Sequence, residues 1–330
     1  MLISILSDLH ITDRTPRSRS DDYSETQFNK IRDALVKVRD TWGSKILVIP
    51  GDIFDSSRVS DVVKKDYIKL IREEAPLVDI LVVFGQHDLR YHSLNTMDNT
   101  PLALLEEACE NVHILGKTPR VYVDKSSKMK VNFHGYHYGE EIQNVERRDG
   151  EYNVLVAHRM VLKGDEQFIP GTPTNTMFRL LPSYDLILTG DNHQTFSKVS
   201  SHDGVVNTLI NAGSLMRMTS AQKEHVPTLF LHNTNSRNTY IDKLPILPAS
   251  DVFVKNEEEV QKETQTERFD RLIELLEAQR STFNSMNIED NLLEFIKQEA
   301  IPEATTNIIK ELLTHAKGHG SSNSSSQETL

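Results

Sequence analysis

Three short apolar segments alternate with two helical patterns in the first third of the chain, and this alternation constrains the fold most. LISIL, KILVI and DILVVF (2–6, 45–49 and 79–84) are rich in Val, Ile and Leu, as expected of strands buried on both faces. Between them, apolar residues recur at helical spacing from Phe28 to Trp42 and from Val59 to Ile71. Such strand–helix–strand units form right-handed crossovers, so the sequence predicts a largely parallel sheet.

The pattern changes after a short helix at 101–110, in which Pro101 suits the first turn. From residue 112 onward, strands follow one another with only a short helical stretch near 175–181 between them. We therefore expect a second sheet packed on the first, giving an α/β fold in which a two-sheet β-sandwich is flanked by helices. The expected strands are VHIL, RVYVD, KMKVNFHGY, YNVLVAH, DLILTG, TLINAGS, PTLFLH and TYIDKLPI.

The composition shifts again after about residue 250. Phe269, Leu272, Ile273 and Leu276 form an apolar stripe at helical spacing, and the LLEFI and IIKELL segments follow it. The sequence ends in the low-complexity segment GHGSSNSSSQETL. We expect a β-sandwich domain at 1–248, a helical extension at 249–317 and a disordered tail at 318–330.

Charge and cysteine content narrow the functional classes. A formal net charge of −11 argues against a protein that coats nucleic acid non-specifically, although an acidic metal site remains compatible with a nuclease. The single cysteine, Cys109, excludes an intrachain disulfide and a cysteine-rich zinc site. No apolar run approaches the ~20 residues of a spanning helix, and MLISILSD reaches an Asp too soon for a signal peptide. We expect an intracellular, cytoplasmic protein.

Polar side chains directly follow five of the expected strands. In open α/β sheets, ligands bind beyond the carboxyl ends of the strands, so residues distant in sequence can meet there. Carboxylates mixed with imidazoles suit manganese, iron or zinc better than calcium, which prefers oxygen ligands. The sequence therefore predicts a site for divalent metal ions. The candidates are Asp8, His10, Asp52, Asp55, Gln86, His87, Asp88, His158, Asp191 and His193.

The motifs at these strand ends resemble those of a known superfamily. DLH, GDIFD, GQHD, AHR and GDNH, in this order, resemble the DxH, GDxxD, GNHD, H and GHxH motifs of the calcineurin-like metallophosphoesterases. GDIFD, VAHRM and NAGSLMR are similar to the SbcD-like DNA double-strand-break repair nucleases, including their phage-encoded relatives. The resemblance covers about residues 1–235 and implies the two-sheet fold of that superfamily.

The resemblance also implies a binuclear metal site. One ion would be held by Asp8, His10, Asp52 and His193, and the second by Asp52, Gln86, His158 and Asp191. His87 matches the histidine that contacts the scissile phosphate and assists the leaving group. Two such ions activate a water for in-line attack on phosphorus. Manganese is the expected metal, with magnesium, iron and zinc as alternatives.

Two residues depart from the superfamily pattern, and both belong to the second ion. Gln86 replaces the Asn of GNHD, which places the amide oxygen one methylene further from the backbone. Asp191 replaces the first His of GHxH and exchanges a nitrogen ligand for a charged oxygen, which favours harder ions. We expect two ions to bind, with weaker occupancy at the second site.

Several neighbouring residues have two interpretations each. Asp88 either orients the His87 ring or caps the following turn, whereas Asp55 is expected to position its neighbours. The basic segment TDRTPRSRS follows DLH, and its cations either hold a DNA backbone or belong to an uninvolved surface loop. Residues that either contact substrate or serve packing and surface roles are Tyr91, His92, His134 and His137, and the basic candidates are Arg14, Arg17, Arg19 and Arg217.

The favoured hypothesis is a manganese-dependent DNA exonuclease and endonuclease, a subunit of an SbcCD-like repair and recombination complex that works as a homodimer. In SbcD-like nucleases a helical segment after the catalytic domain docks on the coiled coil of an SMC-like ATPase, and this is the favoured role for residues 257–317. The alternatives for this helical extension are that it folds back on the catalytic domain or forms a reduced capping domain. Two alternatives stay open. One is a phosphoesterase for small-molecule or phosphoprotein substrates, and the other is a catalytically degenerate binding protein.

Overall fold

The computed structural model describes residues 1–164, 170–202 and 204–254. The chain divides into two units, Met1–Gln265 and Thr266–Leu330, and all of the described residues belong to the first. The helices expected at 257–317 and the expected tail lie outside the described residues, so the domain boundary after residue 248 stays a prediction. None of the helices in the described ranges has the length and apolar character needed to cross a membrane.

The first sheet contains the three strands expected from the opening of the sequence. Strands β1 to β4 pair in parallel in chain order, and β13 adds to β1 in the antiparallel direction. This confirms the predicted parallel arrangement. From one edge to the other, the strands are β14 (Thr239–Lys243), β13 (Thr228–Asn233), β1 (Leu2–Ile5), β2 (Ile46–Ile49), β3 (Asp79–Val82) and β4 (Val112–Ile114).

Three helices connect these strands and begin at side-chain caps. They are α1 (Tyr23–Val36, continued by a π-helical turn at Lys37–Thr41), α2 (Asp61–Glu74) and α3 (Pro101–Ala108). Asp22, Ser60 and Thr100 accept hydrogen bonds from main-chain amides at the three helix starts. Each cap satisfies an otherwise unpaired amide and stabilises its helix by about 1 kcal/mol. Pro101 lies in the first turn of α3, as predicted.

The second sheet has parallel inner strands and antiparallel edges. Its order is β11 (Phe196–His202), β12 (Val205–Asn211), β10 (Leu186–Gly190), β7 (Glu151–His158), β6 (Lys130–Tyr136) and β5 (Arg120–Val123). Smaller elements complete the described chain. They are β8 (Val161–Leu162), β9 (Thr172–Pro173), α4 (Thr174–Leu180), α5 (Ala249–Val252) and 3-10 turns at Arg90–His92, Leu94–Asn99 and Ser220–Gln222.

The expected division between the sheets was wrong for three strands, because β4, β13 and β14 belong to the first sheet. β13 carries Phe230 toward the inter-sheet core and Leu229 toward the helices, so it needs cover on both faces. The position beside β1 provides that cover, with Phe230 opposite Ile5. Strand β11 was missed because it is an edge strand on which Phe196 alone among its described side chains is buried.

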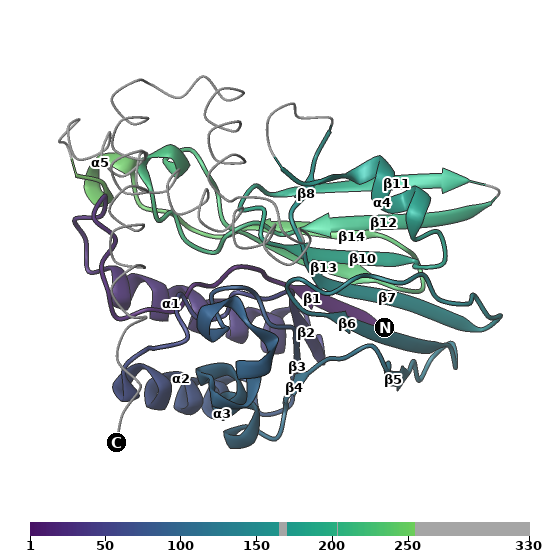
Figure 1. Ribbon diagram of the computed structural model, residues 1–330, viewed down its shortest axis with the longest axis horizontal. Helices are drawn as coiled ribbons and strands as arrows, with labels where there is room; N and C mark the ends of the chain where they lie inside the picture. Colours follow the sequence, from purple (N-terminus) through teal and green to yellow (C-terminus); the bar gives the residue numbers. More distant parts are fainter. Residues whose placement is uncertain (165–169, 203, 255–330) are drawn as a thin grey trace, which may run out of the picture. The chain divides into compact units, whose positions relative to one another are not determined.

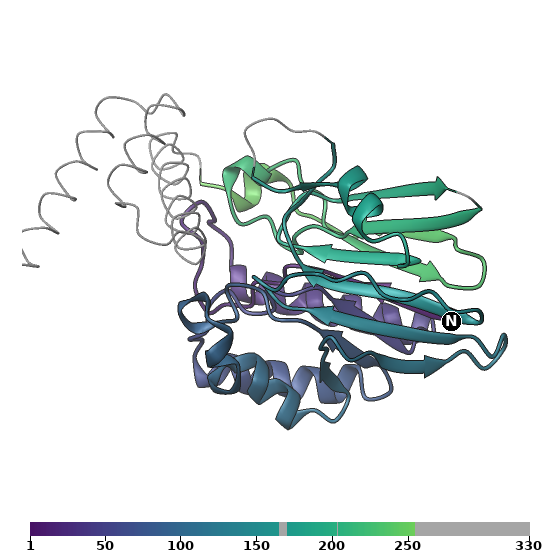
Figure 2. The same ribbon diagram turned by 45° about the vertical axis from the view of Figure 1, so that its right-hand side comes forward.

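Side chains alternate between two layers along each inner strand. Ile5 and Val48 face the second sheet, where they pack with Val156 and Leu188. Their neighbours in the first sheet, such as Leu47, face the helices instead. Figures 1 and 2 show α1, α2 and α3 gathered on one side of the first sheet, with the second sheet across from them. Burying each such aliphatic side chain stabilises the fold by roughly 1.5–3 kcal/mol, so the sandwich is a rigid base for the loops at its edge.

Candidate metal centre

The loops that follow β1, β2, β3, β7 and β10 meet at one edge of the sandwich. Gly190 lies beside His158 in the register of β10 and β7, so the second sheet brings these two loops together. The amide of Asp191 donates to Asp8 Oδ1 at 3.0 Å, which joins the second sheet to the loop after β1. The carboxyl ends of strands from both sheets therefore build a single site.

The backbone at this edge is held in an unusual conformation. Asp8, His10, Asp52 and Asp191 all have positive φ, at 47°, 46°, 49° and 87°. This left-handed region costs a non-glycine residue about 1 kcal/mol or more, and such strain concentrates at functional sites. Gly51, with φ of 92°, permits the sharp turn before Asp52, and a Cβ there would collide with the His158 ring. The turns aim four polar side chains inward at an energetic cost.

Asp8, His10 and His193 form the first group of ligand atoms, all within 4.8 Å of one another. His10 Nε2 and His193 Nε2 are 3.1 Å apart, too close for both rings to be protonated comfortably. Burial and the neighbouring His10 lower the pKa of His193 to about 3. Burial also disfavours charge on His10, but Asp55 and Asp52 outweigh it and raise the pKa of His10 to about 9. His193 is thus neutral, the form in which imidazole binds metal.

Asp8, Asp52 and His158 form the second group. His158 Nδ1 contacts the Pro50 carbonyl oxygen at 2.7 Å, so Nδ1 carries the hydrogen and Nε2 carries the lone pair. That Nε2 lies 3.3 Å from Asp52 Oδ2, and neither atom has a hydrogen-bond partner although both are buried. Burial opposes charge on Asp52, and only the protonated form of His158, with a hydrogen on Nε2 in place of the lone pair, lowers the pKa of Asp52 below the usual range. Together with Asp8, these two atoms form a group that can hold a metal ion.

The two residues that depart from the superfamily motifs contact each other. Gln86 Nε2 donates to Asp191 Oδ1 at 3.0 Å. The other end of the Gln86 amide, Oε1, is buried without a hydrogen-bond partner. Burying an unpaired carbonyl is unfavourable unless an ion or water completes it, so Oε1 has the character of a metal ligand. Asp191, which stands where the superfamily motif has histidine, therefore holds the longer Gln86 side chain in place.

His87 lies beside Asp55 in a third group with His10. Its Nδ1 contacts the Asp55 carbonyl oxygen at 3.2 Å, and its main-chain amide donates to Asp52 Oδ1 at 3.0 Å. Asp55 Oδ1 lies 3.4 Å from His10 Nδ1, so the positioning role expected for Asp55 stays a prediction beside its membership of this ligand group. These contacts leave His87 Nε2 as the ring nitrogen available to a substrate.

The Asp88 carboxylate has a different set of partners from the expected His87 ring or following turn. It accepts hydrogen bonds from the amides of Ile53 at 3.3 Å, Phe54 at 2.9 Å and Gly85 at 3.0 Å. Asp88 therefore ties the loop after β2 to the loop after β3. Because those loops carry Asp52 and Gln86, Asp88 positions the site through the backbone.

Sequence reasoning missed Gln222, which contacts His193 from the far side. Gln222 Nε2 and His193 Nδ1 are 3.2 Å apart, and Gln222 also completes a capping box with Thr219. The T-x-x-Q spacing of that capping box was a readable signal for the turn. Its contact with His193 depends on tertiary packing and has no signature in the sequence.

Two of the four arginines expected near DNA are buried in structural contacts. Arg19 pairs with Asp21 and donates to the Arg217 carbonyl oxygen, and it is only 6% exposed. Arg217 is 5% exposed and donates to the carbonyl oxygens of Lys223 and Leu247. The expectation that Arg19 and Arg217 hold a nucleic acid backbone was therefore wrong. Arg14 and Arg17 are exposed, so they remain candidates.

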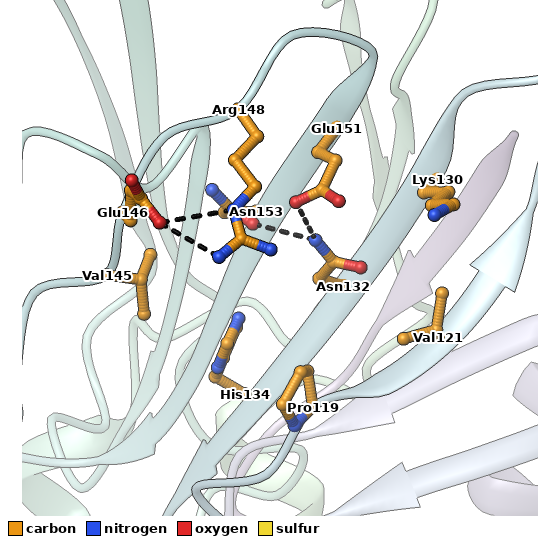
Figure 3. A pocket seen from close by; sticks show the side chains of 10 residues that line it. All are labelled: Pro119, Val121, Lys130, Asn132, His134, Val145, Glu146, Arg148, Glu151 and Asn153. Carbon is orange, nitrogen blue, oxygen red and sulfur yellow. Dashed lines mark hydrogen bonds and ion pairs between the residues drawn. The ribbon is translucent and has the colours of Figure 1, made fainter.

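The histidines of β6 and its end have packing contacts. His137 Nδ1 accepts a hydrogen bond from the Phe84 amide at 3.1 Å, which joins the second sheet to the loop after β3. His134 lines a polar hollow on the outer face of β6 and β7, together with Asn132 and Asn153 (Figure 3). His134 Nδ1 contacts the Lys117 carbonyl oxygen, and Asn132 donates to Asn153 at 3.0 Å. Neither histidine belongs to the three ligand groups.

One family model matches more than half of the chain. The family model described as calcineurin-like phosphoesterase matches residues 1–195. Among solved structures, the calcineurin-like phosphoesterase YfkN from Bacillus subtilis aligns with a TM-score of 0.44 at 15% identity, covering 81% of this chain and 96% of its own. The sulfate thiohydrolase SoxB from Thermus thermophilus aligns with a TM-score of 0.45 at 12% identity, covering 78% of this chain and 58% of its own. No curated protein matches the chain.

Proposed function

Because this chain belongs to the calcineurin-like phosphoesterase family, we propose that it is a metal-dependent DNA nuclease that hydrolyses phosphodiesters. One observation supports metal-dependent hydrolysis: Asp52 Oδ2 and His158 Nε2 are buried 3.3 Å apart, and neither atom has a hydrogen-bond partner. Two buried lone-pair atoms at this distance need a cation between them. A divalent ion supplies this positive charge. A proton on His158 can take the place of the ion only if the pKa of His158 is raised well above its usual value, against the effect of burial.

The donor set fits two divalent ions, with Asp52 common to both. We propose that Asp8, His10, Asp52 and His193 hold one ion, and that Asp52, Gln86, His158 and Asp191 hold the other. Mixed carboxylate, amide and imidazole ligands favour manganese, with magnesium, iron or zinc as alternatives. When bound, such ions acidify a coordinated water and offset charge on the phosphate oxygens.

The chain's own residues orient the His87 ring and supply a proton to the leaving oxygen. The Asp55 carbonyl accepts from His87 Nδ1 and fixes the ring, so that in the imidazolium form the Nε2–H donates its proton to the oxygen that leaves phosphorus, and Nε2 keeps the lone pair. Removing such a proton donor slows hydrolysis by about 10²–10⁴-fold. Asp88 and Gln222 keep the ligand-bearing loops and His193 in place.

DNA is the proposed substrate because exposed cations follow the candidate site residues along their loops. Arg14 and Arg17 follow the Asp8 loop, Arg58 follows Asp55, and Arg90 follows His87, and all four are exposed. In a chain of net charge −11, cations on these loops favour a polyanionic substrate at the site itself. The motif resemblance extends the proposal to an SbcCD-like complex, with a homodimer and an SMC-like ATPase that docks on residues 257–317.

The test is cleavage of end-labelled linear duplex and single-stranded DNA with manganese. Wild-type protein is expected to cleave, and Asp8→Ala and His87→Ala are each expected to lose at least 100-fold in rate. Asp61→Ala is the matched control, because that carboxylate on α2 is 96% exposed and outside the three ligand groups.

Two outcomes would overturn the nuclease proposal. Hydrolysis of a bis-aryl phosphate without any DNA cleavage would favour a phosphoesterase for small or protein substrates. Fewer than one metal ion per chain by elemental analysis, together with no turnover of either substrate, would favour a binding protein.

A further inference from the structure

Arg58, Arg90 and Tyr91 lie at the outer ends of the two loops that carry Asp52 and His87. The loops are fastened together, since Asp88 accepts hydrogen bonds from the amides of Ile53 and Phe54. Arg58 follows Asp55 on the first of these loops, and Arg90 and Tyr91 follow Asp88 on the second. Arg58 and Arg90 are exposed there, and the Tyr91 side chain is 77% exposed.

Tyr91 is presented by a strained turn. Tyr91 and His92 have consecutive positive φ values of 55° and 51°, a conformation that costs each residue about 1 kcal/mol or more. The Thr96 side chain holds the turn in place by accepting from the Arg90 amide at 3.0 Å and donating to the Ser93 carbonyl at 2.7 Å. The turn is therefore strained, and it leaves the Tyr91 ring exposed to solvent instead of packing it in the core.

The Arg90 guanidinium group lies over this ring. Arg90 Cζ lies 5.1 Å from the Tyr91 ring centroid, and Arg90 Nη2 donates to the phenol oxygen at 3.4 Å. The Arg90 hydrogen bond, together with the charges of Arg90 and Arg58, lowers the pKa of the Tyr91 phenol. A flat ring with cations beside it matches a nucleotide, which offers a base face and a phosphate.

Ring contacts connect the turn to the ligand set. The His92 and Tyr138 ring centroids are 6.3 Å apart, and Tyr138 and His158 are 6.4 Å apart, both edge to face. His158 is one of the candidate ligands, so the turn that carries Tyr91 packs onto the metal centre through two rings. Movement of this turn is thereby restricted relative to His158.

We infer that Tyr91, Arg58 and Arg90 form a nucleotide subsite beside the metal centre. In this subsite the Tyr91 ring stacks on the base next to the scissile phosphate, and the two arginines bind the adjoining phosphate. The inference rests on the proposed nuclease function and specifies which part of a strand the enzyme recognises. Stacking tolerates every base, so this subsite confers preference for unpaired nucleotides without sequence specificity.

The test compares Tyr91→Ala with Tyr91→Phe on two single strands, one normal and one with an abasic residue beside the scissile phosphate. Tyr91→Ala is expected to raise KM about tenfold on the normal strand and less than twofold on the abasic strand. Tyr91→Phe keeps the ring and is expected to stay within about threefold of wild type on both. Tyr240→Ala is the control, because this 56% exposed tyrosine lies on edge strand β14.

A binding readout without turnover completes the test. A strand with 2-aminopurine beside a non-hydrolysable linkage is expected to lose fluorescence when its base stacks on wild-type protein or Tyr91→Phe, and to keep it with Tyr91→Ala. Equal KM values and equal quenching for wild type and Tyr91→Ala would overturn the subsite while leaving the nuclease proposal intact. Absence of cleavage of both strands by wild-type protein would instead overturn the nuclease proposal itself.

Discussion

Replacing Asp88 should separate its backbone role from a direct role at His87. Asp88 Oδ1 accepts one main-chain hydrogen bond and Oδ2 accepts two. In Asp88→Asn the amide nitrogen cannot accept, so the favoured orientation leaves one buried N–H unpaired, at a cost of roughly 1–3 kcal/mol. Asp88→Ala leaves three unpaired, at a cost of roughly 3–9 kcal/mol.

Urea unfolding measures this difference through the fluorescence of Trp42, the single tryptophan, which packs against the core of the first sheet. The exposed Asp61→Asn control is expected to change the free energy of unfolding by less than about 0.5 kcal/mol. Affinity for manganese should fall in the order wild type, Asp88→Asn, Asp88→Ala, because the loops with Asp52 and Gln86 separate. If both Asp88 variants were as stable as the wild type and only the pH–rate profile changed, the backbone role of Asp88 would be refuted. Asp88 would then be assigned to orienting the His87 ring.

Two further predictions concern Gln222 and His232. The Gln222 amide oxygen accepts hydrogen bonds from the Met218 and Thr219 amides, so Gln222→Ala leaves both amides without this acceptor and should lower the free energy of unfolding by roughly 1–3 kcal/mol in urea; an unchanged value would contradict the role of Gln222 in this turn. Burial, aided by Arg237, lowers the pKa of His232 from 6.5 to about 4, so the unfolded chain binds the extra proton as pH falls through this window. Stability present above pH 6.5 should fall by about 3 kcal/mol toward pH 4, and His232→Gln should flatten this loss in urea unfolding, whereas an unchanged slope would contradict it.

The first sheet was predictable because strands buried on both faces are almost continuously apolar, as LISIL and KILVI are. Strand β11 was not, since an edge strand buries one side chain and its sequence looks like a loop. The pairing of β13 with β1 joins residues that are more than two hundred positions apart, and no local pattern encodes that choice.

The candidate ligands were predictable from their position after strands. The hydrogen bonds that these residues and their neighbours make with one another were not. Gln86 and Asp191 each looked like a weakened ligand, but the hydrogen bond between them spans 105 positions and braces both. Asp88 looked like a partner of the adjacent His87, and its three main-chain hydrogen bonds became visible only once the loops were placed. Burial of Arg19 and Arg217 likewise depends on contacts between distant segments.

The central claim is that these loops form one cage for two divalent ions that share Asp52. Anomalous diffraction from crystals grown with manganese tests it most directly. Two peaks are expected, one among Asp8, His10, Asp52 and His193, and one among Asp52, Gln86, His158 and Asp191. A crystal saturated with manganese that shows no peak in contact with Asp52 would contradict the account.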